Sequence, residues 1–163
     1  MGVSGAGKTT LAEALAARLG FVFVEGDKLH PQSNIEKMKA GIALDDADRL
    51  PWLQTVGKTV GDHVRAGQGA VAACSALKRR YREILTASAG VPLDFVLLDS
   101  PPAVLAERLG QRPGHFMPTS LLQSQLATLE RPGPDEKALV LDSTRPVAAL
   151  VDAVIAHIGW PDA

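Results

Sequence analysis

The sequence predicts an α/β protein with a parallel sheet that helices cover on both faces, and two observations predict it. Short, continuous apolar runs alternate with longer segments of helical periodicity, and a glycine-rich phosphate-binding pattern directly precedes the first of those helices. Strands that are buried on both faces have unbroken apolar sequences, whereas strands with one face in water alternate apolar and polar residues. The chain has 163 residues without an internal repeat or low-complexity linker, so we expect one domain over residues 1–163.

The phosphate-binding pattern is Gly-x-x-x-x-Gly-Lys-Thr. Its glycines let backbone N–H groups turn toward a phosphate, the lysine reaches the β- and γ-phosphates, and the threonine hydroxyl ligates Mg²⁺. A chance match in a Gly/Ala-rich chain is the alternative, but a strong helix pattern follows at once. We therefore predict ATP and Mg²⁺ as cofactors, Lys8 as catalytic and Thr9 as the metal ligand. The predicted nucleotide-binding residues are Gly2, Val3, Ser4, Gly5, Ala6, Gly7, Lys8, Thr9 and Thr10.

The elements follow from local patterns in chain order. Residues 8–19 form a predicted helix, because leucines recur every fourth residue and Gly20 stands where helices commonly end. Pro51 predicts a break or restart within the helix over 45–65. The remaining predictions are strand 21–24, helix 34–40, strand 70–73, helix 78–87, strand 95–98, helices 103–109 and 120–129, strand 138–141 and helix 147–158.

The strand that normally precedes a phosphate loop is not visible. Such a loop joins a central strand to a helix, but only Met1 precedes Gly2. We therefore expect the first central strand to be largely absent from this chain, a loss of several kcal/mol against a total of roughly 5–15. One interpretation is a start codon placed too late. The other is a truncated chain, a catalytically weak remnant that binds ATP without turnover.

Composition excludes several classes of partner. Lys plus Arg number 17 and Asp plus Glu number 18, so no basic surface for nucleic acid is expected. The single cysteine, Cys74, cannot form an internal disulfide and fits a reducing cytoplasm. No signal peptide and no apolar run of membrane-spanning length is present, which predicts a cytoplasmic protein that acts on small molecules.

Two carboxylates follow apolar runs. Asp27 comes after the first visible strand, and ligands of open α/β sheets bind beyond such strand ends. It would orient or deprotonate an acceptor hydroxyl, or hold a metal through water; the alternative is a turn-forming aspartate after Gly26. Asp99 resembles the end of a Walker B strand, but we interpret it as the start of the next loop.

Three further stretches are unusually specific: residues 26–53 (GDKLHPQSNIEKMKAGIALDDADRLPWL), residues 74–82 (CSALKRRYR), and GHFM at 114–117 with SQLATLE at 124–130. With the phosphate loop, they resemble the gluconate kinases, small P-loop kinases related in fold to shikimate and adenylate kinases. The resemblance spans residues 2 to about 158. It implies a three-layer α/β/α P-loop fold and ATP-dependent phosphorylation of D-gluconate at its 6-hydroxyl to give 6-phospho-D-gluconate. Related kinases are often dimers, which makes a homodimer an open expectation. A kinase of another small hydroxy acid, such as shikimate, is the alternative.

A polyhydroxy acid needs cations for its carboxylate and polar groups for its hydroxyls. Lys78 and Arg82 are spaced i, i+4 and are expected to share a face. For each candidate, an exposed charge or a helix cap is the alternative. The predicted substrate-binding residues are Asp27, His30, Arg49, Ser75, Lys78, Arg79 and Gln125.

Two more arginines are predicted to be catalytic. Arg108 and Arg112 precede His115, and the resemblance implies a lid over the phosphates at about residues 108–120. Their i, i+4 spacing lets both face the site if the helix continues that far, and they would then stabilise charge on the transferring phosphoryl group. Exposed helix-end arginines are the alternative. The resemblance also implies that residues 141–146 lie near the adenine.

Overall fold

The computed structural model describes residues 1–111 and 119–160. Strands and helices alternate along the chain, and the predicted elements are present with bounds that shift by at most two residues. The helices predicted over 8–19 and 147–158 agree to the residue. The elements are α1 (Lys8–Leu19), β1 (Val22–Glu25), the 3-10 helix η1 (Gly26–Leu29), α2 (Gln32–Lys39), α3 (Asp46–Arg65), β2 (Ala70–Ala73), α4 (Arg79–Ala89), β3 (Phe95–Asp99), α5 (Pro102–Gly110), α6 (Thr119–Thr128), β4 (Ala138–Asp142) and α7 (Val147–Ile158).

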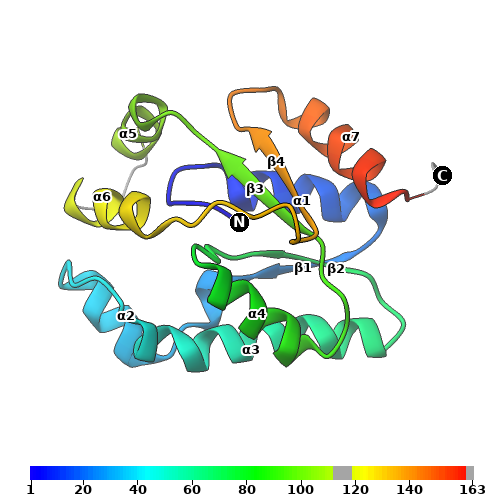
Figure 1. Ribbon diagram of the computed structural model, residues 1–163, viewed down its shortest axis with the longest axis horizontal. Coiled ribbons are helices and arrows are strands. Elements are labelled where there is room, and N and C mark those ends of the chain that lie inside the picture. The colour runs from blue at the N-terminus through cyan, green and yellow to red at the C-terminus, as the bar shows by residue number, and fades with distance from the viewer. Residues whose placement is uncertain (112–118, 161–163) are drawn as a thin grey trace.

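The strands form two separate parallel pairs in the described part of the chain. β1 pairs with β2, starting with Val22 opposite Ala70, and β3 pairs with β4, starting with Phe95 opposite Ala138. The predicted parallel direction is therefore confirmed. The N-terminus lies between the two pairs (Figure 1).

Helices cover both sides of the strands. α1 and α7 lie next to each other on one side, and α3 and α4 pack together on the other (Figure 1). Gly57 and Gly61 allow this close packing: an added Cβ would lie 2.6 Å from the Leu85 carbonyl oxygen and 2.1 Å from that of Ala89, respectively. A larger residue at either position would push α3 away from α4. In the ranges that the structure describes, no helix is both long and apolar enough to cross a membrane.

α3 runs through Pro51 without interruption, so the predicted break is wrong. Proline removes one backbone donor from the helix, but contacts on both sides of it hold the helix in place. Asp45 and Asp48 form a capping box at its start. Trp52 is 1% exposed, and its indole N–H donates to the Gly26 carbonyl over 2.8 Å. Tertiary packing therefore overrides the local signal of the proline.

Candidate active site

The phosphate loop lies between Met1 and α1. Gly2, Gly5 and Gly7 have φ angles of 137°, 82° and 92°, in the region that favours glycine. A Cβ at Gly2 would also lie 2.9 Å from the carbonyl oxygen of Leu98. Gly7 caps α1 without a side-chain hydrogen bond, so the loop meets the N-terminal end of α1, where backbone N–H groups and the helix dipole favour an anion.

Polar atoms of this loop form hydrogen bonds with other groups of the protein. The Ser4 amide donates to Oε1 of Gln125 over 2.7 Å, and Nζ of Lys8 donates to the Val3 carbonyl over 2.9 Å. A bound phosphate would offer Lys8 a stronger, charged acceptor. Gln125 comes from α6, so the structure brings this predicted site residue against the loop.

Glu25 is a candidate site residue that the predictions from the sequence did not single out. It ends β1, and its Oε2 accepts a hydrogen bond from the Thr9 hydroxyl over 2.8 Å. A hydroxyl beside a carboxylate supplies the hard oxygen ligands that Mg²⁺ prefers. The sequence pattern that singled out Asp27, a carboxylate at the carboxyl end of a parallel strand, would also have indicated Glu25.

Asp27 lies in η1, directly beyond β1, and is exposed. Its backbone amide is 3.4 Å from Oε1 of Glu25. The preceding residue fixes its position: a Cβ at Gly26 would lie 2.5 Å from the Ala73 carbonyl oxygen, and Trp52 binds the Gly26 carbonyl. The strand end therefore presents two carboxylates, one bonded to Thr9 and one open to solvent.

Arg49 and Lys78 lie around the ring of Tyr81. The guanidinium carbon of Arg49 is 5.7 Å from the ring centroid and Nζ of Lys78 is 5.5 Å from it. Lys78 donates to Asp46 over 2.8 Å, and the Tyr81 hydroxyl donates to the same carboxylate. These two hydrogen bonds hold the pKa of Asp46 below its ordinary value. Two of the predicted substrate cations therefore lie together.

His30 stacks on Trp52, with ring centroids 4.0 Å apart and an interplanar angle of 16°. Its Nδ1 lies 3.2 Å from Nδ2 of Asn34, which also donates to the Asp48 carbonyl. Burial lowers the pKa of His30, so the ring is neutral near pH 7. Because Nδ1 accepts from the Asn34 amide, Nε2 carries the proton and can donate to a ligand hydroxyl.

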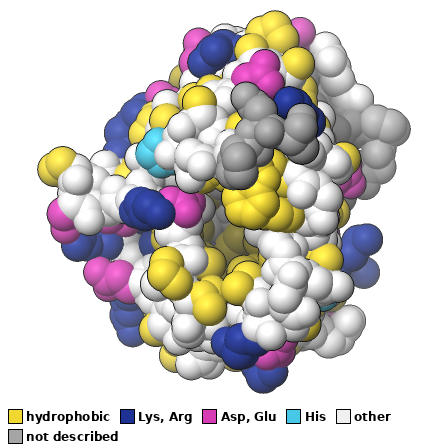
Figure 2. Space-filling model, turned by 90° about the vertical axis from the view of Figure 1, so that its right-hand side faces the viewer, with side chains coloured by type: hydrophobic (Ala, Val, Ile, Leu, Met, Phe, Trp, Pro, Cys, Tyr) yellow, Lys and Arg dark blue, Asp and Glu magenta, His cyan; other side chains and the backbone are white. Residues whose placement is uncertain are grey.

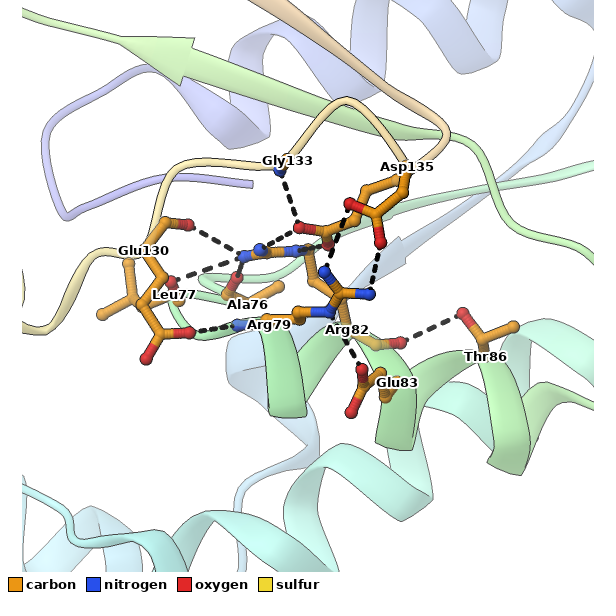
Figure 3. Close-up of polar contacts among 10 residues, drawn as sticks. Ala76, Leu77, Arg79, Arg82, Glu83, Thr86, Glu130, Gly133 and Asp135 are labelled. Atoms are coloured by element: carbon orange, nitrogen blue, oxygen red, sulfur yellow. Dashed lines mark hydrogen bonds and ion pairs between the residues drawn. The ribbon is translucent and has the colours of Figure 1, made fainter.

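Arg79 lies in an exposed ion-pair network at the start of α4. Its guanidinium binds Asp135 at 2.6 Å and Glu83 at 3.1 Å (Figure 3). Half of the Arg79 side chain is exposed to solvent. Its guanidinium contacts these carboxylates, whereas Arg49 and Lys78 lie around the Tyr81 ring, so this placement does not support the prediction that Arg79 binds substrate.

Arg82 is buried, at 2% exposure, and binds Glu136 through two nitrogens at 2.5 and 2.8 Å. It also donates to the carbonyls of Ala76 and Glu130 (Figure 3). The prediction that Lys78 and Arg82 share a helix face is therefore wrong. Lys78 is the N-cap of α4, with an extended backbone, and the i, i+4 rule holds only inside a helix.

Ser75 lies two residues beyond β2, and Asp99 is the last residue of β3. The Ser75 carbonyl accepts the Gly2 amide over 3.0 Å, which places Ser75 beside the start of the phosphate loop. The Asp99 carboxylate binds Arg131 at 2.7 Å. Asp99 is the last residue of β3, so the expectation that it begins the next loop is wrong, and its carboxylate is paired with this arginine at the end of the strand.

A cavity of about 380 Å³ lies beside the phosphate loop, where α5 meets the loop that follows β4. Arg108 lines it and donates to the Ser143 carbonyl over 2.8 Å, while its other terminal nitrogen is 3.5 Å from the Ala6 carbonyl oxygen. Ser143 belongs to the segment that was predicted to approach the adenine. Arg108 therefore joins that segment to the phosphate loop.

The predicted lid is only partly described. Arg108 and Arg112 could share a helix face only if the helix extended to residue 112. α5 ends at Gly110, so this condition is not met. Arg112, together with His115, lies outside the described residues.

Comparisons with known proteins agree with this geometry. A family model described as "AAA domain" matches residues 1–132. The gluconokinase of Gluconobacter oxydans (strain 621H) is 52% identical over 162 residues, which are 99% of this chain and 90% of that protein. The thermoresistant gluconokinase of Escherichia coli (strain K12) is 42% identical over 157 residues, 95% of this chain and 89% of that protein. The crystal structure of a gluconokinase from Sinorhizobium meliloti 1021 has a TM-score of 0.86 at 46% identity and covers 98% of this chain and 89% of that one.

The fold, the loop at the start of α1 and the carboxylates at and just beyond the end of β1 define a P-loop kinase, as the sequence predicted. Such kinases use ATP. Within this class, the chain belongs to the gluconokinase family.

Proposed function

We propose that this protein transfers the γ-phosphoryl group of ATP to the 6-hydroxyl of D-gluconate, giving 6-phospho-D-gluconate and ADP. The observation that carries the proposal is the common placement of the phosphate loop, the β1 carboxylates and Lys78 around the carboxyl ends of parallel strands. The names of the related proteins supply the substrate.

The residues at the loop have separable roles in this proposal. Lys8 and the N–H groups at the start of α1 bind the phosphates. Thr9 and Glu25 would hold Mg²⁺, which neutralises charge on the phosphate oxygens when it is bound; their oxygen atoms, 2.8 Å apart, suit that ion. The exposed carboxylate of Asp27 orients the acceptor hydroxyl and accepts its proton.

The acceptor is bound mainly through its own charge. Arg49 and Lys78 pair with the gluconate carboxylate, for which the Arg49 fork is well shaped. The neutral His30 donates from Nε2 to a hydroxyl, and Ser75 and Gln125 contact the ligand close to the loop. For Ser75 and Gln125 the support is their contact with the phosphate loop, and for Arg49 and Lys78 it is their common place around the Tyr81 ring.

Arg108 stabilises negative charge on the nucleotide from the wall of the 380 Å³ cavity. We retain Arg112 and the lid over residues 108–120 as part of the proposal on the basis of the sequence. The homodimer and the cytoplasmic location also stay predictions.

A coupled ADP-release assay with Mg-ATP tests the function. We expect turnover with D-gluconate and none with shikimate or without an acceptor. Nucleotide binding without turnover on any acceptor would favour an ATP-binding remnant instead. Turnover with shikimate would move the assignment to another hydroxy-acid kinase.

Glu25→Gln tests the proposed role of the Glu25 carboxylate in binding Mg²⁺. Because the change removes a negative charge beside Thr9, we expect the Mg²⁺ concentration for half-maximal rate to rise by about tenfold, with excess Mg²⁺ restoring much of the rate. A Mg²⁺ titration at fixed ATP measures it. The matched control is Glu36→Gln on α2, whose carboxylate binds Gln32; equal titration curves for both variants would contradict the role of Glu25.

Lys78→Met tests the carboxylate site. Loss of a charge-assisted hydrogen bond should raise the KM for gluconate by about tenfold or more and leave the KM for ATP unchanged. The neighbouring Arg79→Met removes an equal charge from the exposed network and should leave both constants unchanged. If Arg79→Met raises the gluconate KM as much as Lys78→Met, the assignment of Lys78 fails.

A further inference from the structure

The acceptor is a polar molecule, so its place follows from polar groups and not from the size of a cavity. A cavity of about 430 Å³ opens on the face shown in Figure 2, where hydrophobic side chains line the hollow. A polyhydroxy acid would lose hydrogen bonds to water there without regaining them. Ser75 and Lys78, by contrast, follow β2 at the edge where the phosphate loop begins. The backbone between these two residues therefore decides where two proposed acceptor groups lie.

The turn between Ser75 and Lys78 has a strained backbone. Ala76 has a φ of 43° and, in the part of the chain that the structure describes, is the one non-glycine residue with a positive φ. A side chain makes this conformation costly. Ala76 is also buried, at 1% exposure, so its carbonyl needs a donor from the protein. Strained residues of this kind persist only where surrounding contacts determine them, and they cluster at functional sites.

Arg82 supplies that donor from the first turn of α4. Its Nη1 lies 3.3, 3.5 and 3.1 Å from the carbonyl oxygens of Ala76, Leu77 and Glu130, respectively. Its other two nitrogens, Nε and Nη2, bind both carboxylate oxygens of Glu136. The guanidinium can serve all of these acceptors together because its N–H groups have a fixed, planar arrangement. One buried side chain therefore joins the strained turn to a segment about fifty residues later in the chain.

That segment, residues 129–136, also holds the start of α4 directly (Figure 3). The Glu130 amide donates to the Leu77 carbonyl over 2.8 Å, and the Glu130 carboxylate accepts the Arg79 amide over 2.8 Å. The N-cap residue of α4, Lys78, makes no capping bond with its own side chain. Glu130 therefore caps the helix from a distant part of the chain, at the point where Lys78 leaves the backbone.

The same segment follows α6, which contacts the phosphate loop. The Leu129 amide donates to the Gln125 carbonyl over 3.0 Å, and the Gln125 side chain accepts the Ser4 amide over 2.7 Å. Residues 129–136 therefore connect α6 with the turn that follows β2, and Arg82 binds both ends of this connection.

We propose that Arg82 is a positioning residue for the acceptor: it sets the place of Lys78 relative to Gln125 by binding the turn that carries the first and the segment that follows the second. The inference rests on the proposed function, in which both of these residues contact the acceptor. Arg82 itself, at 2% exposure, is too deeply buried to contact the substrate. It acts through the backbone that it binds, so its loss weakens acceptor binding more than nucleotide binding.

Arg82→Lys tests the proposal, because lysine keeps the charge but cannot bind the carbonyls and Glu136 together. Well below Tm, we expect the KM for gluconate to rise by about tenfold and the KM for ATP to change by less than about twofold. Hydrogen exchange at the Ser4 and Glu130 amides should become faster by at least about tenfold. The control is Val151→Ala in the buried face of α7, which lowers Tm by leaving a cavity and should leave both readouts unchanged.

Glu130→Ala tests the same connection if Arg82→Lys does not fold. Glu130 is exposed, so the fold should tolerate the loss of its carboxylate. The KM for gluconate should rise by about threefold, with the KM for ATP unchanged, because the cap of α4 beside Lys78 is lost. Glu83→Ala removes another exposed carboxylate that binds Arg79; it is the matched control and should change neither constant.

Two results would overturn the proposal. Equal KM values in Arg82→Lys and Val151→Ala would show that Arg82 serves stability alone. A raised gluconate KM without faster exchange at the Ser4 amide would show that the effect does not pass through residues 129–136. A parent chain without turnover on gluconate would contradict the proposed function instead, and the exchange rates would still decide whether Arg82 holds the two segments together.

Discussion

Asp27→Asn is expected to lower kcat by about 10²–10⁴-fold, the usual contribution of a general base, while the affinity for ATP stays unchanged. Asparagine keeps the size of the side chain and can still contact a hydroxyl, but it cannot accept the proton. Because Asp27 is exposed and its position depends on contacts of Gly26, the substitution should not disturb the fold. Steady-state kinetics with Mg-ATP and gluconate measure the change, and ATP binding is followed separately.

Asp99→Asn is the matched control for this prediction. It makes the same chemical change at the end of another parallel strand, but its carboxylate binds Arg131 and not a residue of the phosphate loop. We expect kcat to change by less than about threefold, since an exposed ion pair contributes little. A large loss with Asp99→Asn and a small one with Asp27→Asn would reverse the two assignments and make Asp99 the working carboxylate.

Local sequence patterns were enough to predict the elements and the phosphate loop. The leucine spacing of α1 and the glycine at its end are encoded within one segment, so no tertiary information was needed. The loop was equally local, because three glycines with positive φ must occur at fixed positions. Pro51 was misjudged for the opposite reason, since contacts of Trp52 with η1 help to hold that helix together.

The spacing of the basic residues at the start of α4 did not predict which partner each side chain binds. Lys78, Arg79 and Arg82 lie within five positions of one another, yet one faces Asp46, one faces solvent and one is buried against Glu136. The partners Asp135 and Glu136 follow more than fifty residues later, and nothing in the sequence indicates that their loop returns to α4. Arginine in a basic run is ambiguous until its carboxylate is located.

Arg82→Met is expected to lower the free energy of unfolding by about 3–5 kcal/mol, because removing one partner of a buried ion pair leaves the other uncompensated. Glu136, whose side chain is 12% exposed, would lose both of its bonds to the guanidinium. The carbonyls of Ala76 and Glu130 would lose a donor as well. For a chain of this size we expect Tm to fall by about 10 °C. The second change in Arg82→Met/Glu136→Leu should recover much of that loss, whereas Arg79→Met in the exposed network should shift Tm by no more than about 2 °C.

The same pair predicts a dependence on pH. Hydrogen bonds from Arg82 hold the pKa of Glu136 below its ordinary value of 4.5, so the pair contributes fully above about that pH. Its contribution is lost as the pH falls through the lowered pKa of the folded state. The difference in stability between the parent chain and Arg82→Met should therefore be largest above pH 5 and narrow toward pH 3, as urea titrations at several pH values would measure. A difference that stays constant across that range would mean that Arg82 stabilises the protein by packing and by its carbonyl contacts, and not by its charge.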